Sequence, residues 1–333
     1  MSSGSSLPYQ LRPNKAVDRE LFLSFLSRIA ATLKLERYGY IGLGGPFLED
    51  FRLIHARLGI KDMVCIEAEE DVHRRQFFNR PVDCIECVHD TLEDYLDGNE
   101  IEHPSIIWFD YTEPGRITDQ IERFSRTVGE VPIGSILRIT LNANPSSLGK
   151  PDPDEITTED GPIEKRRGGK NNLQEWRLER FRERVGSMFP SELRPNDMTF
   201  KRYGRSVLCT LDLAVDQYVI GLPDRKVIWV LATHYADGQP MVTGTLLVSS
   251  EDEESRLKEL IEEWGFYSTP NDPLLLDMPA LSALERLCME SSDDPRAALD
   301  FDLPKTEMRE DPFEAFKRFY RVFPHFSRVE VGP

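Results

Sequence analysis

The chain has 333 residues, of which 40% are hydrophobic and 30% are charged, and its formal net charge is −17. This length and composition are typical of a soluble globular protein with one enlarged domain or two. The negative charge disfavours non-specific binding to nucleic acid or anionic membranes, although a local basic patch can override it.

No part of the sequence indicates export, membrane insertion or a metal site. The first ten residues, MSSGSSLPYQ, lack the basic and apolar regions of a signal peptide, and no apolar run approaches the ~20 residues of a membrane span. The five cysteines, an odd number, indicate reduced thiols. Cys84 and Cys87 have CxxC spacing without a second ligand pair, so we interpret them as strand thiols. We therefore predict a cytoplasmic protein.

The first part of the chain alternates between helical and strand-like patterns. Apolar residues recur every four positions from Val17 to Leu33 and predict an amphipathic helix. The strands predicted after it cover residues 38–43, 62–66, 82–88, 106–110 and 135–141, and the helices between them cover residues 48–58, 71–79, 92–96 and 119–128. Such alternation with short connections predicts parallel strands joined by right-handed crossovers.

The alternation stops at Asn142. Residues 145–172 are rich in Pro, Asp, Gly and Lys and predict a long loop or insertion. Helical patterns follow at residues 173–188 and 207–220.

Two strand-like segments, residues 226–234 and 241–249, flank the turn signal Asp237-Gly238 and predict an antiparallel β-hairpin. A charged helix is predicted at residues 253–264. The predicted organisation is an N-terminal helical prefix (1–37), an α/β domain (38–250, with an insertion at about 145–190) and a helical extension or small domain (251–333).

Residues 38–69 hold the pattern that most strongly indicates a ligand site. An apolar strand runs into Gly42, Gly44 and Gly45, a helix follows, and the next strand stops at Glu67. Glycines let backbone N–H groups and a helix N-terminus approach a ligand, and the carboxylate can accept hydrogen bonds from ribose hydroxyls. Alternatively, the glycines form a tight turn that binds nothing, and Glu67 is a solvated strand-end acid.

Five parallel-type strands closed by a β-hairpin resemble the class I S-adenosylmethionine-dependent methyltransferases, in particular O-methyltransferase-like proteins. The resemblance runs from the first strand to the hairpin and implies a Rossmann-like sheet with S-adenosylmethionine as cofactor. It places Gly42, Gly44 and Gly45 beside the methionine and ribose, Glu67 on the ribose hydroxyls, and Asp90 near the adenine edge. For Asp90, an N-cap of the following helix is the alternative.

The resemblance also places Asp110, at the end of the fourth strand, beside the transferred methyl group. Methyl transfer from a sulfonium is an in-line displacement that often needs a base to remove a proton from the acceptor. For an oxygen acceptor, the candidate bases or orienting groups are Asp110, Glu113 and His89. His234 is a further candidate, with a structural role as the alternative.

Two positions depart from the pattern of these methyltransferases. Tyr40 lies two residues before Gly42, where they usually carry an acid that pairs with the methionine ammonium. The motif from Asp110 to Pro114, DYTEP, lacks the paired prolines typical of amino-group methylation of bases. We therefore predict a methyltransferase for an oxygen acceptor, with nitrogen less favoured.

The alternative function is a catalytically degenerate methyltransferase fold that docks a protein or nucleic acid, which Tyr40 favours. Its contact would be a basic segment that can bind a phosphate-bearing or acidic partner, formed by Lys165, Arg166, Arg167 and Lys170. The arginines that follow are expected to pair with glutamates three or four residues away on one helix.

An NAD-dependent oxidoreductase is disfavoured. The pattern that begins Gly42-x-Gly44 reaches Phe47 where the dinucleotide motif has Gly or Ala, and the predicted hairpin closes the sheet.

Overall fold

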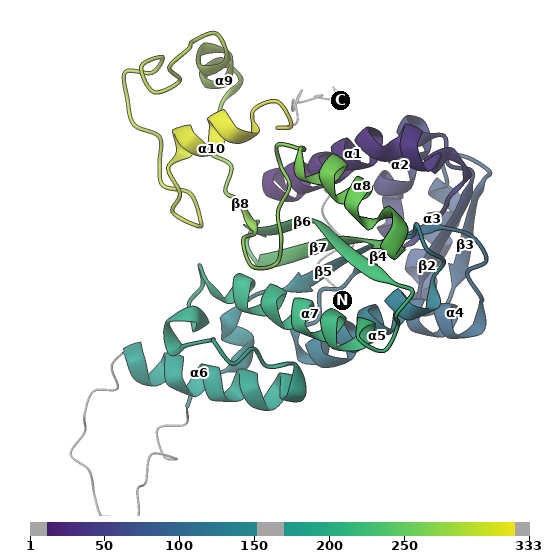
Figure 1. Cartoon of the computed structure of the whole chain (residues 1–333). Coiled ribbons are helices and arrows are strands. Elements are labelled where there is room, and N and C mark those ends of the chain that lie inside the picture. Colours follow the sequence, from purple (N-terminus) through teal and green to yellow (C-terminus); the bar gives the residue numbers. More distant parts are fainter. Residues whose placement is uncertain (1–11, 152–169, 324–333) are drawn as a thin grey trace, which may run out of the picture. The chain divides into compact units, whose positions relative to one another are not determined.

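The computed structural model describes residues 12–151 and 170–323, apart from the side chains of residues 170–172 (Figure 1). The described chain divides into two compact units. Unit 1 contains residues 12–92, 235–238 and 275–323, and unit 2 contains residues 93–151, 170–234 and 239–274. Each unit is therefore assembled from segments far apart in the sequence.

Strands and helices alternate as predicted. The strands are β1 (Gly39–Gly42), β2 (Asp62–Glu67), β3 (Ile85–His89), β4 (Ser105–Asp110), β5 (Ile136–Asn142), β6 (Lys226–Ala236), β7 (Pro240–Ser249) and β8 (Leu274–Leu276). The α-helices are α1 (Pro13–Leu33), α2 (Glu49–Leu58), α3 (Glu70–Asn79), α4 (Leu92–Gly98), α5 (Ile117–Glu130), α6 (Lys170–Val185), α7 (Tyr203–Val219), α8 (Glu251–Glu262), α9 (Ala283–Glu290) and α10 (Pro312–Phe319).

The strands pair side by side within each unit. In unit 1 their order is β3-β2-β1, and both pairs are parallel. In unit 2 the order is β4-β5-β7-β6, in which β4 and β5 are parallel and β5 and β7 antiparallel. A mostly parallel sheet closed by a hairpin confirms the predicted Rossmann-like fold class.

In unit 1, the register of the parallel strands brings the predicted ligand-site residues to one edge. Gly42 of β1 lies opposite Cys65 of β2, and Glu67 of β2 lies opposite His89 of β3. The residues of β2 before Glu67 are apolar and buried, except at its start. Because parallel neighbours end at the same edge, the glycine loop, Glu67 and His89 all emerge there.

The hairpin tip caps the first helix. The Asp237 carboxylate accepts hydrogen bonds from the backbone N–H groups of Asn14 (3.2 Å) and Lys15 (2.8 Å). The Asn14 side chain donates to the Ala236 carbonyl oxygen (2.7 Å) and accepts from the Met278 N–H (2.7 Å). These bonds satisfy donors that the start of α1 would otherwise leave unpaired.

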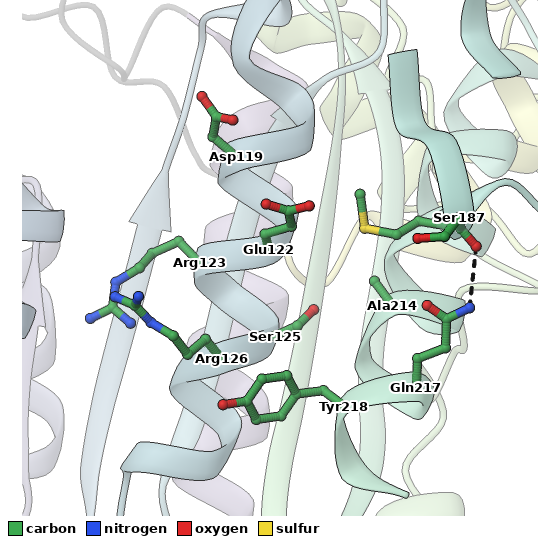
Figure 2. Close-up of a pocket in the computed structure, with 10 residues that line it drawn as sticks. Asp119, Glu122, Arg123, Ser125, Arg126, Ser187, Ala214, Gln217 and Tyr218 are labelled. Atoms are coloured by element: carbon green, nitrogen blue, oxygen red, sulfur yellow. Dashed lines mark hydrogen bonds between the residues drawn. The ribbon is translucent and has the colours of Figure 1, made fainter. Parts of the chain in front are cut away.

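In unit 2, α5 and α7 lie side by side (Figure 1). They approach closely at Gly129 of α5, where an added Cβ atom would lie 2.8 Å from Cε1 of Tyr218. Figure 2 shows the Tyr218 ring between the two helices.

Residues 251–323 contain the helices α8, α9 and α10 and the short strand β8. α9 begins with a capping box between Ser282 and Glu285, and Met289 of α9 packs with Phe313 and Phe316 of α10. None of the helices in the described part of the chain has the length and hydrophobicity of a membrane span.

Candidate functional site

The glycine loop connects β1 to α2 through a short 3-10 turn, Gly45–Phe47. Gly45 has a φ of 51°, in the left-handed region that favours glycine. A Cβ atom on Gly44 would lie 2.7 Å from Sγ of Cys65 and 3.0 Å from Cε2 of Phe51. Gly44 is therefore required for close packing of the loop on β2 and α2, which is a structural role.

We expect the Gly44→Ala substitution to destabilise the protein by roughly 1–3 kcal/mol, because the added methyl group overpacks the contact with Cys65. Urea denaturation measures the change. The double variant Gly44→Ala/Cys65→Ala removes the nearest atom and should recover part of the loss. Equal stability of the single variant and the wild type would contradict this packing role.

Glu67 ends β2 and is partly exposed. One carboxylate oxygen accepts a hydrogen bond from the Glu69 N–H at 2.9 Å, and the backbone N–H of Ala68 also interacts with the carboxylate. Burial raises the pKa of the Glu67 carboxyl, which the Glu69 N–H partly offsets. The carboxylate has about four lone-pair sites, so it can also accept a hydrogen bond from a ligand hydroxyl.

His89 lies beside Glu67 on the neighbouring strand, and its ring stacks on His73 of α3 with 5.3 Å between ring centroids. Nε2 of His89 lies 3.1 Å from the Ala68 carbonyl oxygen, so Nε2 donates there and carries a proton. In the neutral tautomer, Nδ1 is then the acceptor.

Asp90 is tied to both Glu67 and the start of α4. Its N–H donates to the Glu67 carbonyl oxygen at 3.1 Å, and its carboxylate accepts from the Thr91 N–H at 2.8 Å. The contact with Thr91 is local and lies just before α4, as expected if Asp90 helps to cap that helix.

Tyr40, at the position where the resembling proteins carry an acid, is buried and packs edge-on against Phe51 at 4.7 Å between ring centroids. Its side chain therefore belongs to the hydrophobic core of unit 1.

Asp110 and Glu113 belong to unit 2. Asp110 ends β4 opposite Thr140 of β5 and is partly buried, whereas the Glu113 side chain is exposed. The backbone carbonyl oxygen of Glu113 accepts from Nε2 of Gln120 on α5 at 3.0 Å, which fixes the loop after β4.

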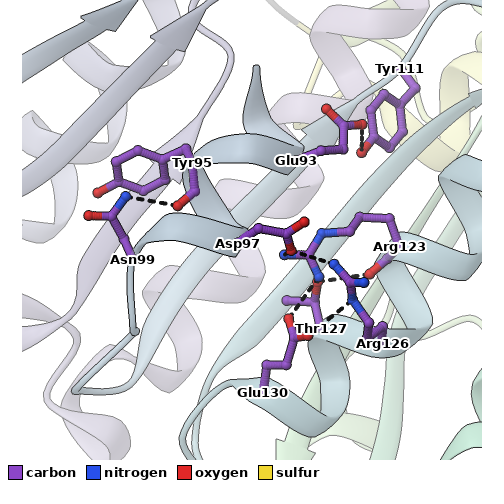
Figure 3. Close-up of polar contacts among 9 residues, drawn as sticks. All are labelled: Glu93, Tyr95, Asp97, Asn99, Tyr111, Arg123, Arg126, Thr127 and Glu130. Carbon is purple, nitrogen blue, oxygen red and sulfur yellow. Dashed lines mark hydrogen bonds and ion pairs between the residues drawn. The ribbon is translucent and has the colours of Figure 1, made fainter. Parts of the chain in front are cut away.

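Sequence reasoning did not single out Tyr111, the residue after Asp110. Its hydroxyl donates to Oε1 of Glu93 at 2.8 Å (Figure 3). Burial, and then the neighbouring Glu93 carboxylate, raise the pKa of Tyr111. Tyr111 is thus neutral, and its hydrogen bond to Glu93 holds the backbone beside Asp110. The sequence signal that could have identified it is its position directly after an acid at a strand end.

The candidate residues thus fall into two groups. Gly42, Gly44, Gly45, Glu67, His89 and Asp90 gather at one edge of unit 1, and Asp110 and Glu113 lie in the loop after β4 of unit 2.

His234 of β6 is 3% exposed, and a Cβ atom on Gly204 of α7 would lie 2.6 Å from three of its ring atoms. Burial lowers its pKa from 6.5 to about 4. These observations favour a structural role over that of a general base.

Because the folded-state pKa of His234 lies below the unfolded value, its neutral form is favoured by folding. The associated stability is present above pH 6.5 and is lost as the pH falls through about 4. We expect this loss to be ~3 kcal/mol. Urea denaturation at a series of pH values should show a shallower acid slope for His234→Gln than for the wild type; identical slopes would contradict the expectation.

No group of three His, Cys, Asp or Glu residues suited to a metal ion is found within the described residues. Cys84 and Cys87 are free thiols, and Cys84 precedes β3 rather than lying in it.

Of the predicted basic segment, Lys165, Arg166 and Arg167 lie outside the described residues, as does the side chain of Lys170, where α6 begins. Of the arginines that follow in α6, two pair with glutamates as expected, whereas Arg177 and Arg184 donate to backbone carbonyl oxygens of Gly149, Pro114 and Ser147. Arg180 bonds to Glu183 at 2.8 Å, and Arg182 to Glu179 at 2.7 Å.

Residues 7–331 match a protein family described as "Putative O-methyltransferase". No curated protein matches the sequence. The distantly similar solved structures include the following three. Trm1 from Pyrococcus horikoshii, in complex with S-adenosyl-L-methionine, shares 13% identity with a TM-score of 0.44, over 86% of this chain and 75% of that chain. An rRNA methylase from Streptococcus thermophilus shares 13% identity with a TM-score of 0.34, over 69% of this chain and 95% of that chain. A "putative caffeoyl-CoA O-methyltransferase" from Staphylococcus aureus shares 10% identity with a TM-score of 0.33, over 67% of this chain and 82% of that chain.

Proposed function

The chain belongs to the family described as "Putative O-methyltransferase", and from this premise we propose that it transfers the methyl group of S-adenosylmethionine to an oxygen atom of its acceptor. The observation that carries the proposal is the position of Glu67. It ends β2 beside the glycine loop, and its partly exposed carboxylate has lone pairs that can accept further hydrogen bonds.

The residues at this edge of unit 1 fit the adenosine part of the cofactor. A ribose presents two neighbouring hydroxyl donors, and the Glu67 carboxylate is an acceptor held at the strand end. The backbone around Gly45 supplies N–H groups without side-chain bulk, and Asp90 lies next to His89 on the adjoining connection. When bound, S-adenosylmethionine supplies an electrophilic methyl group on a sulfonium that is already a good leaving group.

The chain's own residues would then orient the acceptor and remove its proton. Asp110 and Glu113 carry carboxylates that can accept a hydrogen bond from an acceptor hydroxyl. Nδ1 of His89 can take a proton, because Nε2 is engaged with Ala68. The buried Tyr40 supplies no carboxylate for the cofactor ammonium group, so that contact falls to another group.

Incubation of the full-length protein with S-adenosylmethionine carrying a ¹³C-methyl group, and with acceptors bearing either hydroxyl or amino groups, tests the proposal. Carbon NMR separates a methyl group on oxygen from one on nitrogen. We expect labelled O-methyl product, and less of it from Asp110→Asn. Labelled product on nitrogen alone would overturn the oxygen assignment and leave the methyltransferase assignment standing.

A further inference from the structure

A cavity of about 510 Å³ opens between α5 and α7 in unit 2 (Figure 2). One wall comes from α5, with Asp119, Glu122 and Ser125. The opposite wall comes from α7 and from the 3-10 turn that follows α6, Gly186–Met188. The Tyr218 ring, which packs on Gly129, closes the groove between the helices at one end.

Two arginines border this cavity but are neutralised outside it. Arg123 pairs with Asp97 (3.4 Å) and Glu130 (2.7 Å), and Arg126 pairs with the same two carboxylates (Figure 3). Figure 2 shows both guanidinium groups turned away from Glu122. Two cations and two anions compensate each other, so these arginines leave the cavity without excess positive charge.

The charge facing the cavity is negative. Glu122 has no ion pair or hydrogen bond within the described chain, and Asp119 lies 3.6 Å from Arg116. An unpaired carboxylate beside a cavity favours a cationic ligand.

Two further acceptors face the same space. Ser125 is 3% exposed and lines the cavity, and its hydroxyl has no hydrogen-bond partner within the described residues. Nε2 of Gln217 donates to the Ser187 carbonyl oxygen at 3.2 Å, which fixes the amide and leaves its oxygen on the cavity side. A buried hydroxyl without a partner costs roughly 1–3 kcal/mol, a cost that a bound hydrogen-bond donor removes.

We propose that this cavity binds a small organic ammonium ion with a hydrocarbon arm. The Glu122 carboxylate, the Ser125 hydroxyl and the Gln217 amide oxygen match the three N–H donors of a primary ammonium. Met188 and Ala214 supply apolar contact for the hydrocarbon, and the Tyr218 ring supplies a face for the cation.

Titration calorimetry of the full-length protein without S-adenosylmethionine tests the site with three probes of one length: n-hexylamine, n-hexanol and hexanoate. We expect the amine to bind with a Kd of about 10 mM or tighter, and the alcohol and the acid at least about tenfold more weakly. Failure of this test leaves the methyltransferase proposal unaffected, because the residues proposed to hold the cofactor belong to unit 1.

Matched variants locate the binding. Glu122→Gln and Ser125→Ala should each weaken amine binding, the former by about tenfold, and Ala214→Leu should block it by filling the cavity. Glu259→Gln, which changes an exposed carboxylate on α8, is the control and should bind as the wild type does.

The proposal is overturned if n-hexylamine does not bind at about 10 mM or if hexanoate binds equally well. It is also overturned if Glu122→Gln and Ala214→Leu, folded as judged by circular dichroism, bind the amine as the wild type does.

Discussion

Replacing Glu67 by alanine is expected to weaken the binding of S-adenosylhomocysteine by about ten- to a hundredfold, because a hydrogen bond to an ionised carboxylate contributes ~1.5–3 kcal/mol. The effect on the fold should be small, since the side chain interacts locally, with the backbone N–H groups of Glu69 and Ala68. As the pH is lowered, binding should begin to weaken at a higher pH than it would with an ordinary glutamate. The reason is that burial raises the pKa of Glu67, and the protonated carboxyl group is a poorer acceptor.

Titration calorimetry at several pH values measures both effects. Glu36→Gln, which changes an exposed carboxylate of the same unit, serves as the control and should leave the affinity unchanged. Equal affinity of Glu67→Ala and the wild type would remove Glu67 from the cofactor site.

Replacing Arg19 by methionine is expected to lower the free energy of unfolding by about 3–5 kcal/mol. Arg19 of α1 pairs with Glu49 (3.3 Å) and Asp50, the first two residues of α2, and all three side chains are only 7–9% exposed. Without the guanidinium group, two carboxylates remain buried at the helix that follows the glycine loop.

Urea denaturation measures the loss of stability. The control is Arg57→Met, which breaks a more exposed pair with Glu20 between the same two helices and should cost no more than about 1 kcal/mol. Adding Glu49→Gln and Asp50→Asn to Arg19→Met should restore much of the stability, since no unpaired charge then stays buried. Equal losses for Arg19→Met and Arg57→Met would contradict this account.

Much of the fold could be predicted from local patterns. The apolar runs of β2 and β4 and the Asp237-Gly238 turn each place an element within a few residues, because these signals arise from the segment itself. β8 was not predicted, since three residues, Leu274–Leu276, are too few for a periodic pattern.

Contacts between distant segments could not be predicted. The Asp237 turn was expected, but not its second use as the cap of α1, because the bonded residues lie 222 to 223 positions apart. The ion pair between Arg19 and Glu49 could not be predicted either, because no local sequence pattern connects the two residues. At the candidate site, the position of Glu67 could be predicted, because the apolar run of β2 ends there. The packing role of Gly44 depends on Cys65 and Phe51, which only the folded chain brings near.

The most direct test of the central claim is titration of the full-length wild-type protein with S-adenosylmethionine and S-adenosylhomocysteine. We expect saturable binding of one molecule per chain that depends on Glu67, together with a rise in the melting temperature. Neither heat nor a thermal shift at about 1 mM of either compound would contradict it.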